Sequence, residues 1–116
     1  MNKVIAVDFD GTLCENKWPQ VGAPRWAVIY RLLDEKANGA SIILWTCREG
    51  ELLKHAVEAA ASWGIQFDAI NDSLPSWKTA WKSDPRKIGA SEYWDDKAVF
   101  IPMFGALPGE GAHNES

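Results

Sequence analysis

Continuous apolar runs, separated by polar and glycine-containing segments, predict a chain that alternates strands and helices. The run from Val4 to Val7 is typical of a parallel strand buried on both faces, and it predicts a strand over residues 3–9. Ile42 to Leu44 form a second run and predict a strand over residues 41–45. Shorter apolar segments predict three more strands, at residues 67–70, at a segment ending at residues 93–94, and at residues 98–101.

Two segments between these runs have the periodicity of amphipathic helices. From residue 26 to residue 37 apolar side chains recur every three or four positions, between Pro24 as a start signal and Gly39 as a stop signal. A second helix is expected over residues 49–63. Two further segments are polar and contain prolines, so we expect a loop at residues 14–24 and a loop with about one helical turn at residues 71–86.

The order strand, helix, strand, helix, strand, strand predicts an α/β fold. Right-handed crossovers then give a parallel sheet flanked by helices. The chain has 116 residues, which is the size of one domain. We expect this domain to span residues 1–104, and residues 105–116, which are small and polar, to form a flexible tail.

The overall charge predicts no bulk attraction to nucleic acid or to an anionic membrane, because 12 basic and 16 acidic residues give a net charge of −4. Cys14 and Cys47 lack metal-ligand spacing, and two such thiols predict a reducing, cytoplasmic location. The first apolar run ends at Asp8 and is too short for a signal peptide. No segment approaches the roughly 20 apolar residues of a membrane span, so we expect no membrane partner.

Acidic and polar side chains follow three of the predicted strands. They are Asp8 and Asp10 after the first strand, Thr46 and Arg48 after the second, and Asp95 and Asp96 after the fourth. The carboxyl ends of parallel strands meet at one edge of the sheet, where ligands bind. Four carboxylates at one edge repel one another unless a cation neutralises them, and Mg²⁺ prefers oxygen ligands of this kind. A carboxylate nucleophile, a metal and cationic or hydroxyl donors are the parts that phosphoryl transfer requires.

Four segments in this order resemble the motifs of the haloacid dehalogenase (HAD) superfamily of phosphatases. They are Asp8-Phe9-Asp10-Gly11-Thr12-Leu13, the strand Ile43-Leu44-Trp45 with Thr46-Cys47-Arg48, the single residue Lys87, and Tyr93-Trp94-Asp95-Asp96. The resemblance spans residues 3–97 and is closest to a small branch that includes the phosphatase domain of phage polynucleotide kinase. It implies a Rossmann-like, HAD-like parallel sheet with a minimal cap or none.

The resemblance also implies a role for each matched residue. Asp8 would attack phosphorus and form an aspartyl-phosphate, and Asp10 would act as general acid and then as general base. Mg²⁺ would be held by Asp8, the backbone carbonyl of Asp10 and Asp96, with Asp95 close by or bridging through water. Three residues would bind the phosphoryl group: Thr46, Arg48 and Lys87. The acid at position 10 favours hydrolysis of phosphate esters over the other reactions of the superfamily.

The sequence alone leaves open which lysine belongs to the third motif and what Trp77 and Trp81 do. Lys78 and Lys82 compete with Lys87 for the role of the third-motif lysine, and the sequence pattern of Lys87 and of Arg48 also fits a solvated surface charge. Trp77 and Trp81 are interleaved with these bases, a pattern able to stack on and clamp a nucleotide or a single strand. The same pattern is found in solvated helices with two anchoring rings.

Two functions of other classes compete with a phosphomonoesterase: a phospho-signalling receiver domain and a non-catalytic accessory protein with the same fold. A receiver has its acceptor Asp after a middle strand, where this chain has Thr46.

Residues 12–25 and 71–86 are too few for a folded cap, so we expect an open site. Such a site suits a nucleotide, a nucleic-acid phosphate end or another large phosphorylated substrate. The oligomeric state, and with it a cap borrowed from a neighbouring subunit, stays open.

Overall fold

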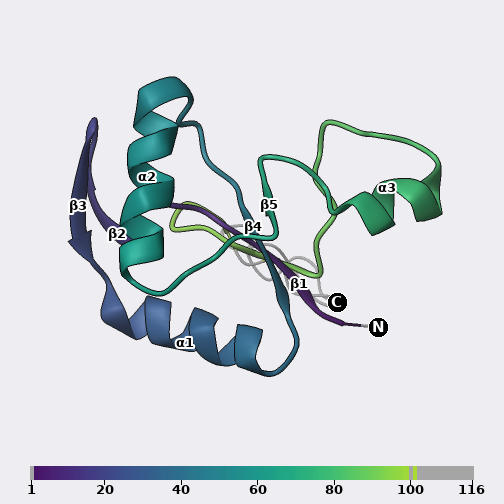
Figure 1. Cartoon of the computed structure of the whole chain (residues 1–116), viewed down its shortest axis with the longest axis horizontal. Helices are drawn as coiled ribbons and strands as arrows, with labels where there is room; N and C mark the ends of the chain where they lie inside the picture. Colours follow the sequence, from purple (N-terminus) through teal and green to yellow (C-terminus); the bar gives the residue numbers. More distant parts are fainter. Residues whose placement is uncertain (1, 100, 102–116) are drawn as a thin grey trace, which may run out of the picture.

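A four-stranded parallel sheet forms the centre of the protein, as the computed structural model of the chain shows for residues 2–99 and 101 (Figure 1). The strands are β1 (Val4–Val7), β4 (Ser41–Leu44), β5 (Ala69–Ile70) and β6 (Glu92–Trp94), in the order β5-β4-β1-β6. Val7 is in register with Leu44 on one side and with Trp94 on the other. The residues that follow β1, β4 and β6 therefore emerge side by side at one edge.

The helices cover both faces of this sheet. They are α1 (Trp26–Ala37), α2 (Gly50–Ser62) and α3 (Pro75–Trp81). Ile5 and Val7 pack with buried residues of α1 and α2, whereas Val4 and Ala6 belong to a second cluster that includes Trp77 of α3. This alternation explains why all four residues of β1 are buried, as expected for a strand covered on both sides.

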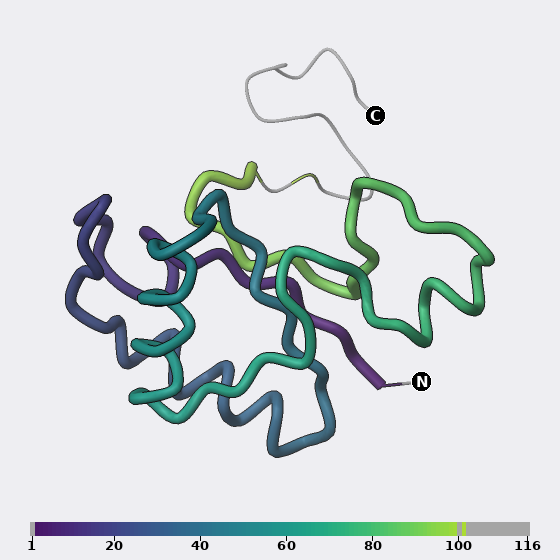
Figure 2. The backbone as a smooth tube through the Cα atoms, turned by 45° about the horizontal axis from the view of Figure 1, so that its top comes forward, coloured from purple at the N-terminus to yellow at the C-terminus, as the bar shows by residue number. Residues whose placement is uncertain are grey.

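A two-stranded antiparallel hairpin, β2 (Cys14–Lys17) and β3 (Gln20–Pro24), occupies the segment for which the sequence predicts a loop. Its polar side chains gave no strand signal. The hairpin depends on backbone proximity instead, because a Cβ at Gly22 would overlap the carbonyl of Glu15. It lies beside α2 in both backbone views (Figures 1 and 2).

The other predicted elements are confirmed with small shifts of their ends, with two exceptions. The helix at residues 75–81 has seven residues, longer than the single turn expected. The strand expected at residues 98–101 is wrong for Ala98, Val99 and Ile101, which lie outside any strand. Val99 and Ile101 are exposed, so burial does not favour an extended strand there. The tail expected at residues 105–116 lies outside the described residues.

Within residues 2–99 and 101, no helix has the length and apolar character that a membrane span requires.

Candidate active site

The loop after β1 brings the first acidic pair to the edge of the sheet. The Asp8 backbone N–H donates to the Trp94 carbonyl (2.8 Å), which continues the ladder between β1 and β6 up to the site. The Thr12 hydroxyl contacts Asp8 Oδ2 (3.3 Å) and accepts from the Asp96 N–H (3.1 Å), so one side chain links the two acidic loops. Gly11 has a φ of +89°, and a Cβ there would overlap the Asp96 carboxylate. The site therefore requires glycine at this position.

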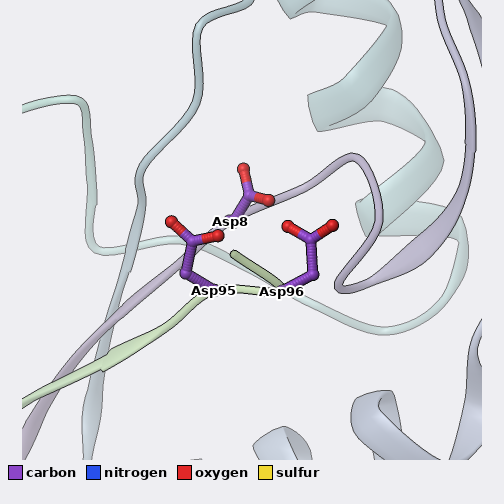
Figure 3. Close-up of side chains that lie close together, drawn as sticks. All are labelled: Asp8, Asp95 and Asp96. Carbon is purple, nitrogen blue, oxygen red and sulfur yellow. The ribbon is translucent and has the colours of Figure 1, made fainter. Parts of the chain in front are cut away.

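Three carboxylates converge at this edge. Asp8 follows β1, Asp95 and Asp96 follow β6, and each offers an oxygen within 4.8 Å of the others (Figure 3). Within the described residues, none of the three forms a salt bridge with a basic side chain. Three neighbouring oxygen donors with uncompensated negative charge fit a hard divalent cation such as Mg²⁺. The resemblance expects Mg²⁺ on Asp8, the backbone carbonyl of Asp10 and Asp96, with Asp95 close by, and the side-chain cluster contains Asp8, Asp95 and Asp96 of this set.

Asp8 is half-buried, and this affects its charge. Burial, together with the negative charges of Asp95 and Asp96, raises the pKa of the Asp8 carboxyl from its ordinary 3.8 to about 6. The Phe9 backbone N–H partly opposes this effect by bonding to the carboxylate. A cation bound among these groups would favour the ionised form, because it replaces like-charge repulsion by attraction.

Thr46 follows β4 and faces the same pocket. Its N–H donates to Asn71 Oδ1 (2.8 Å), and its hydroxyl oxygen accepts from the Arg48 N–H (3.1 Å). The hydroxyl proton is therefore available to a bound anion. Since α2 begins at Gly50 and its N-cap residue is Glu49, Thr46 is not the cap of that helix. Asn71, for which the sequence carries no motif, holds the Thr46 backbone in place from the end of β5.

Arg48 is not where the resemblance implied. Its side chain is buried and forms a bidentate pair with Asp10, at 2.8 Å from Nε to Oδ2 and 2.7 Å from Nη2 to Oδ1. This carboxylate raises the pKa of the Arg48 guanidinium. Arg48 lies outside the group of residues that line the pocket. The Asp10 carboxylate bonds to Arg48 and is not part of the cluster of metal-ligand candidates.

The lysines expected near the phosphate also lie elsewhere. Lys87 Nζ lies 5.3 Å from the centroid of the Tyr93 ring, in a groove lined also by Trp77 and Trp81. Lys87 comes before the amino end of β6 in the chain, whereas Asp95 and Asp96 follow its carboxyl end. Lys78 pairs with Asp72 at 2.8 Å.

A cavity of about 250 Å³ surrounds the acidic cluster. Its lining residues are Asp8, Asp10, Asn16, Trp18, Thr46, Cys47, Asp95, Asp96 and Lys97. Lys97 is thus the lysine that the structure brings to the pocket, and its place directly after the two acids of the fourth motif was the available signal. Asn16 and Trp18 reach it through the hairpin, which the sequence did not predict.

A conserved protein from Bacteroides thetaiotaomicron has a similar solved structure. It is 35% identical to this chain, with a TM-score of 0.76, and the match covers 88% of this chain and 83% of that one. The chain belongs to the same family as this Bacteroides protein. It matches no protein-family model and no curated protein sequence. The relationship establishes family and fold, and the activity has to be inferred from the chemistry of the site.

Proposed function

We propose that the protein is a Mg²⁺-dependent phosphomonoester hydrolase of the HAD type, with Asp8 as the nucleophile. The observation that supports this most strongly is the convergence of Asp8, Asp95 and Asp96 at the carboxyl edge of the sheet, beside Thr46 in one cavity. The resemblance of the four sequence segments to HAD motifs supports the same assignment. Mg²⁺ held by these carboxylates would neutralise charge on the phosphoryl oxygens and draw Asp8 into its ionised form.

The chain's own residues account for the remaining steps. With Asp10 in its protonated form, an Asp8 carboxylate oxygen attacks phosphorus while the bond from phosphorus to the ester oxygen breaks, and that oxygen takes the proton from Asp10. Water then attacks the phosphorus of the aspartyl-phosphate and gives a proton back to Asp10, and the bond between Asp8 and phosphorus breaks. The Thr46 hydroxyl donates to a phosphoryl oxygen during both steps. Inorganic phosphate and free Asp8 result.

The cavity favours substrates that extend beyond it. The interval after the first motif forms the β2–β3 hairpin, and the interval after β5 contains α3 and its loops, so neither forms a separate cap domain. Trp18, at the hairpin tip, leaves 52% of its surface exposed beside the cavity. A flat apolar ring at this place is able to stack on the leaving group of a nucleotide or aryl phosphate.

A phosphate-release screen with MgCl₂ tests the proposal, with p-nitrophenyl phosphate, mononucleotides, sugar phosphates and 3′-phosphorylated oligonucleotides as substrates. We expect multiple turnovers, loss of activity in EDTA, and loss of at least about a thousandfold in kcat for Asp8→Asn. Asp34→Asn, on the exposed side of α1, is the matched control and should keep the parental rate. A single burst of phosphate without turnover would instead support a receiver-like domain, and absence of release from every substrate would support an accessory protein.

A further inference from the structure

Arg48 is the largest fully buried side chain in the described part of the protein, with 1% of its surface exposed. A guanidinium in the interior costs desolvation free energy unless its charge and its N–H groups are matched by the protein. The hydrogen-bond acceptors around the Arg48 guanidinium therefore indicate the role of this side chain.

Protein acceptors take all five of its N–H donors. Two bond to Asp10, as described above, and the other three bond to backbone carbonyls: Nη2 to Gln20 (2.9 Å), Nη1 to Pro19 (3.1 Å) and Nη1 to Leu52 (3.2 Å). A guanidinium has five N–H groups and no more. No donor is left for a phosphoryl oxygen.

These acceptors come from three separate parts of the chain. Asp10 belongs to the loop after β1, Pro19 and Gln20 to the hairpin turn, and Leu52 to the first turn of α2. The guanidinium carbon also lies 5.1 Å from the Trp18 ring centroid and 5.2 Å from that of the buried Phe9. One side chain therefore joins the hairpin tip, the base of α2 and the proposed acid–base residue.

We propose that Arg48 is a positioning residue that fixes two walls of the active site at once, the Asp10 carboxylate and the hairpin tip with Trp18, and that it does not bind the substrate phosphate. The catalytic part of this inference rests on the proposed function. A carboxylate accepts about four hydrogen bonds, and Arg48 takes two at Asp10, so each oxygen keeps a lone pair for exchange of a proton in the cavity. The hairpin then acts as a fixed wall.

Lysine cannot replace this group. Its ammonium offers three donors from one atom, whereas the site requires a planar fork that reaches acceptors on several sides. We expect Arg48→Lys and Arg48→Ala to lower kcat at least a hundredfold, while the inhibition constant of inorganic phosphate stays within threefold of the parent. A direct phosphate ligand would show a rise of at least tenfold in that constant, and this result would overturn the proposal.

Chemical rescue separates positioning from general loss of structure. Guanidinium chloride at low, non-denaturing concentration should restore the kcat of Arg48→Ala at least tenfold, because the ion refills the vacated site, and equal NaCl should not. Lys54→Ala, an exposed cation on α2, is the matched control and should be unaffected throughout. Lack of rescue in a variant that keeps its circular dichroism spectrum and its Mg²⁺-induced thermal shift would contradict the proposal.

A second readout needs no activity. Trypsin is specific for bonds after lysine and arginine, and Lys17 is an exposed residue at the end of β2 next to Trp18. We expect cleavage of this bond at least ten times faster in Arg48→Lys and in Asp10→Asn, which keeps the arginine and removes only its charged partner. Unchanged cleavage in folded Asp10→Asn would show that Asp10 and the hairpin are not joined through Arg48. If the parent protein releases no phosphate, the proposed function fails, and the proteolysis result decides the connection on its own.

Discussion

Replacing Asp8 by Asn should stabilise the metal-free protein while it abolishes turnover. The Asp8 carboxyl has a pKa of about 6 in the folded protein against an ordinary 3.8, because it is half-buried beside Asp95 and Asp96. At about 1.4 kcal/mol per pKa unit, this difference corresponds to about 3 kcal/mol. Solvent screening at a half-exposed group reduces that figure, and we expect about 1–2 kcal/mol.

The sign of the effect gives its pH dependence. The folded-state pKa is raised, so the contribution of Asp8 to stability is fully present below pH 3.8 and is lost as the pH rises through about 6. The amide that replaces the carboxyl in Asp8→Asn carries no charge and is insensitive to this change, while its oxygen is able to keep the contact with the Thr12 hydroxyl. The stability gain of Asp8→Asn over the parent should therefore be close to zero at pH 4 and largest above pH 7.

Thermal and urea unfolding in EDTA at pH 4, 5, 6 and 7.5 measure this difference, with Asp34→Asn as the exposed control. At pH 7.5 we expect Asp8→Asn to unfold about 4–8 °C above the parent. Added MgCl₂ should stabilise the parent and reduce the gap, because the cation supplies the missing positive charge. Two results would refute the conclusion that the ionised Asp8 carboxylate destabilises the metal-free protein. One is an Asp8→Asn variant less stable than the parent at pH 7.5 in EDTA, and the other is a stability difference that does not depend on pH.

Other substitutions test the remaining parts of the site. In a Mg²⁺ titration of activity, Asp96→Ala should require more metal than Asp95→Ala, and equal or reversed requirements would show that the pair is assigned wrongly. Gly11→Ala should lower kcat at least about tenfold and weaken the Mg²⁺-induced thermal shift, because its Cβ would displace the Asp96 carboxylate; an unchanged shift would contradict this. Trp18→Ala should lower kcat/KM for nucleotides by an amount equivalent to about 1–3 kcal/mol of lost stacking free energy, and it should affect small sugar phosphates much less. Trp77→Ala, whose ring lies in the groove before β6, should leave both substrates unchanged, and a selective loss for nucleotides would restore a role for that groove.

The sequence predicted the acidic part of the site because that part depends on strand ends. Asp8 follows an apolar run, and Asp96 follows the segment predicted to end as a strand at residues 93–94. The carboxyl ends of neighbouring parallel strands meet at one edge of the sheet. The same geometry accounts for the place of Lys87. A residue that precedes β6 begins at the opposite edge from residues that follow it, unless its loop turns back along the sheet.

The β2–β3 hairpin and the direction of the Arg48 side chain depend on contacts between segments far apart in the sequence. The polar residues of the β2–β3 hairpin have no periodic apolar pattern, and their pairing depends on antiparallel backbone contact and on the glycine that permits close approach at position 22. Local sequence places Arg48 two residues after Thr46, but the direction of its side chain depends on which acceptors surround it. Those acceptors come from the loop after β1, the hairpin and α2, segments that meet only in the folded chain, and a buried guanidinium follows the geometry that satisfies all its donors.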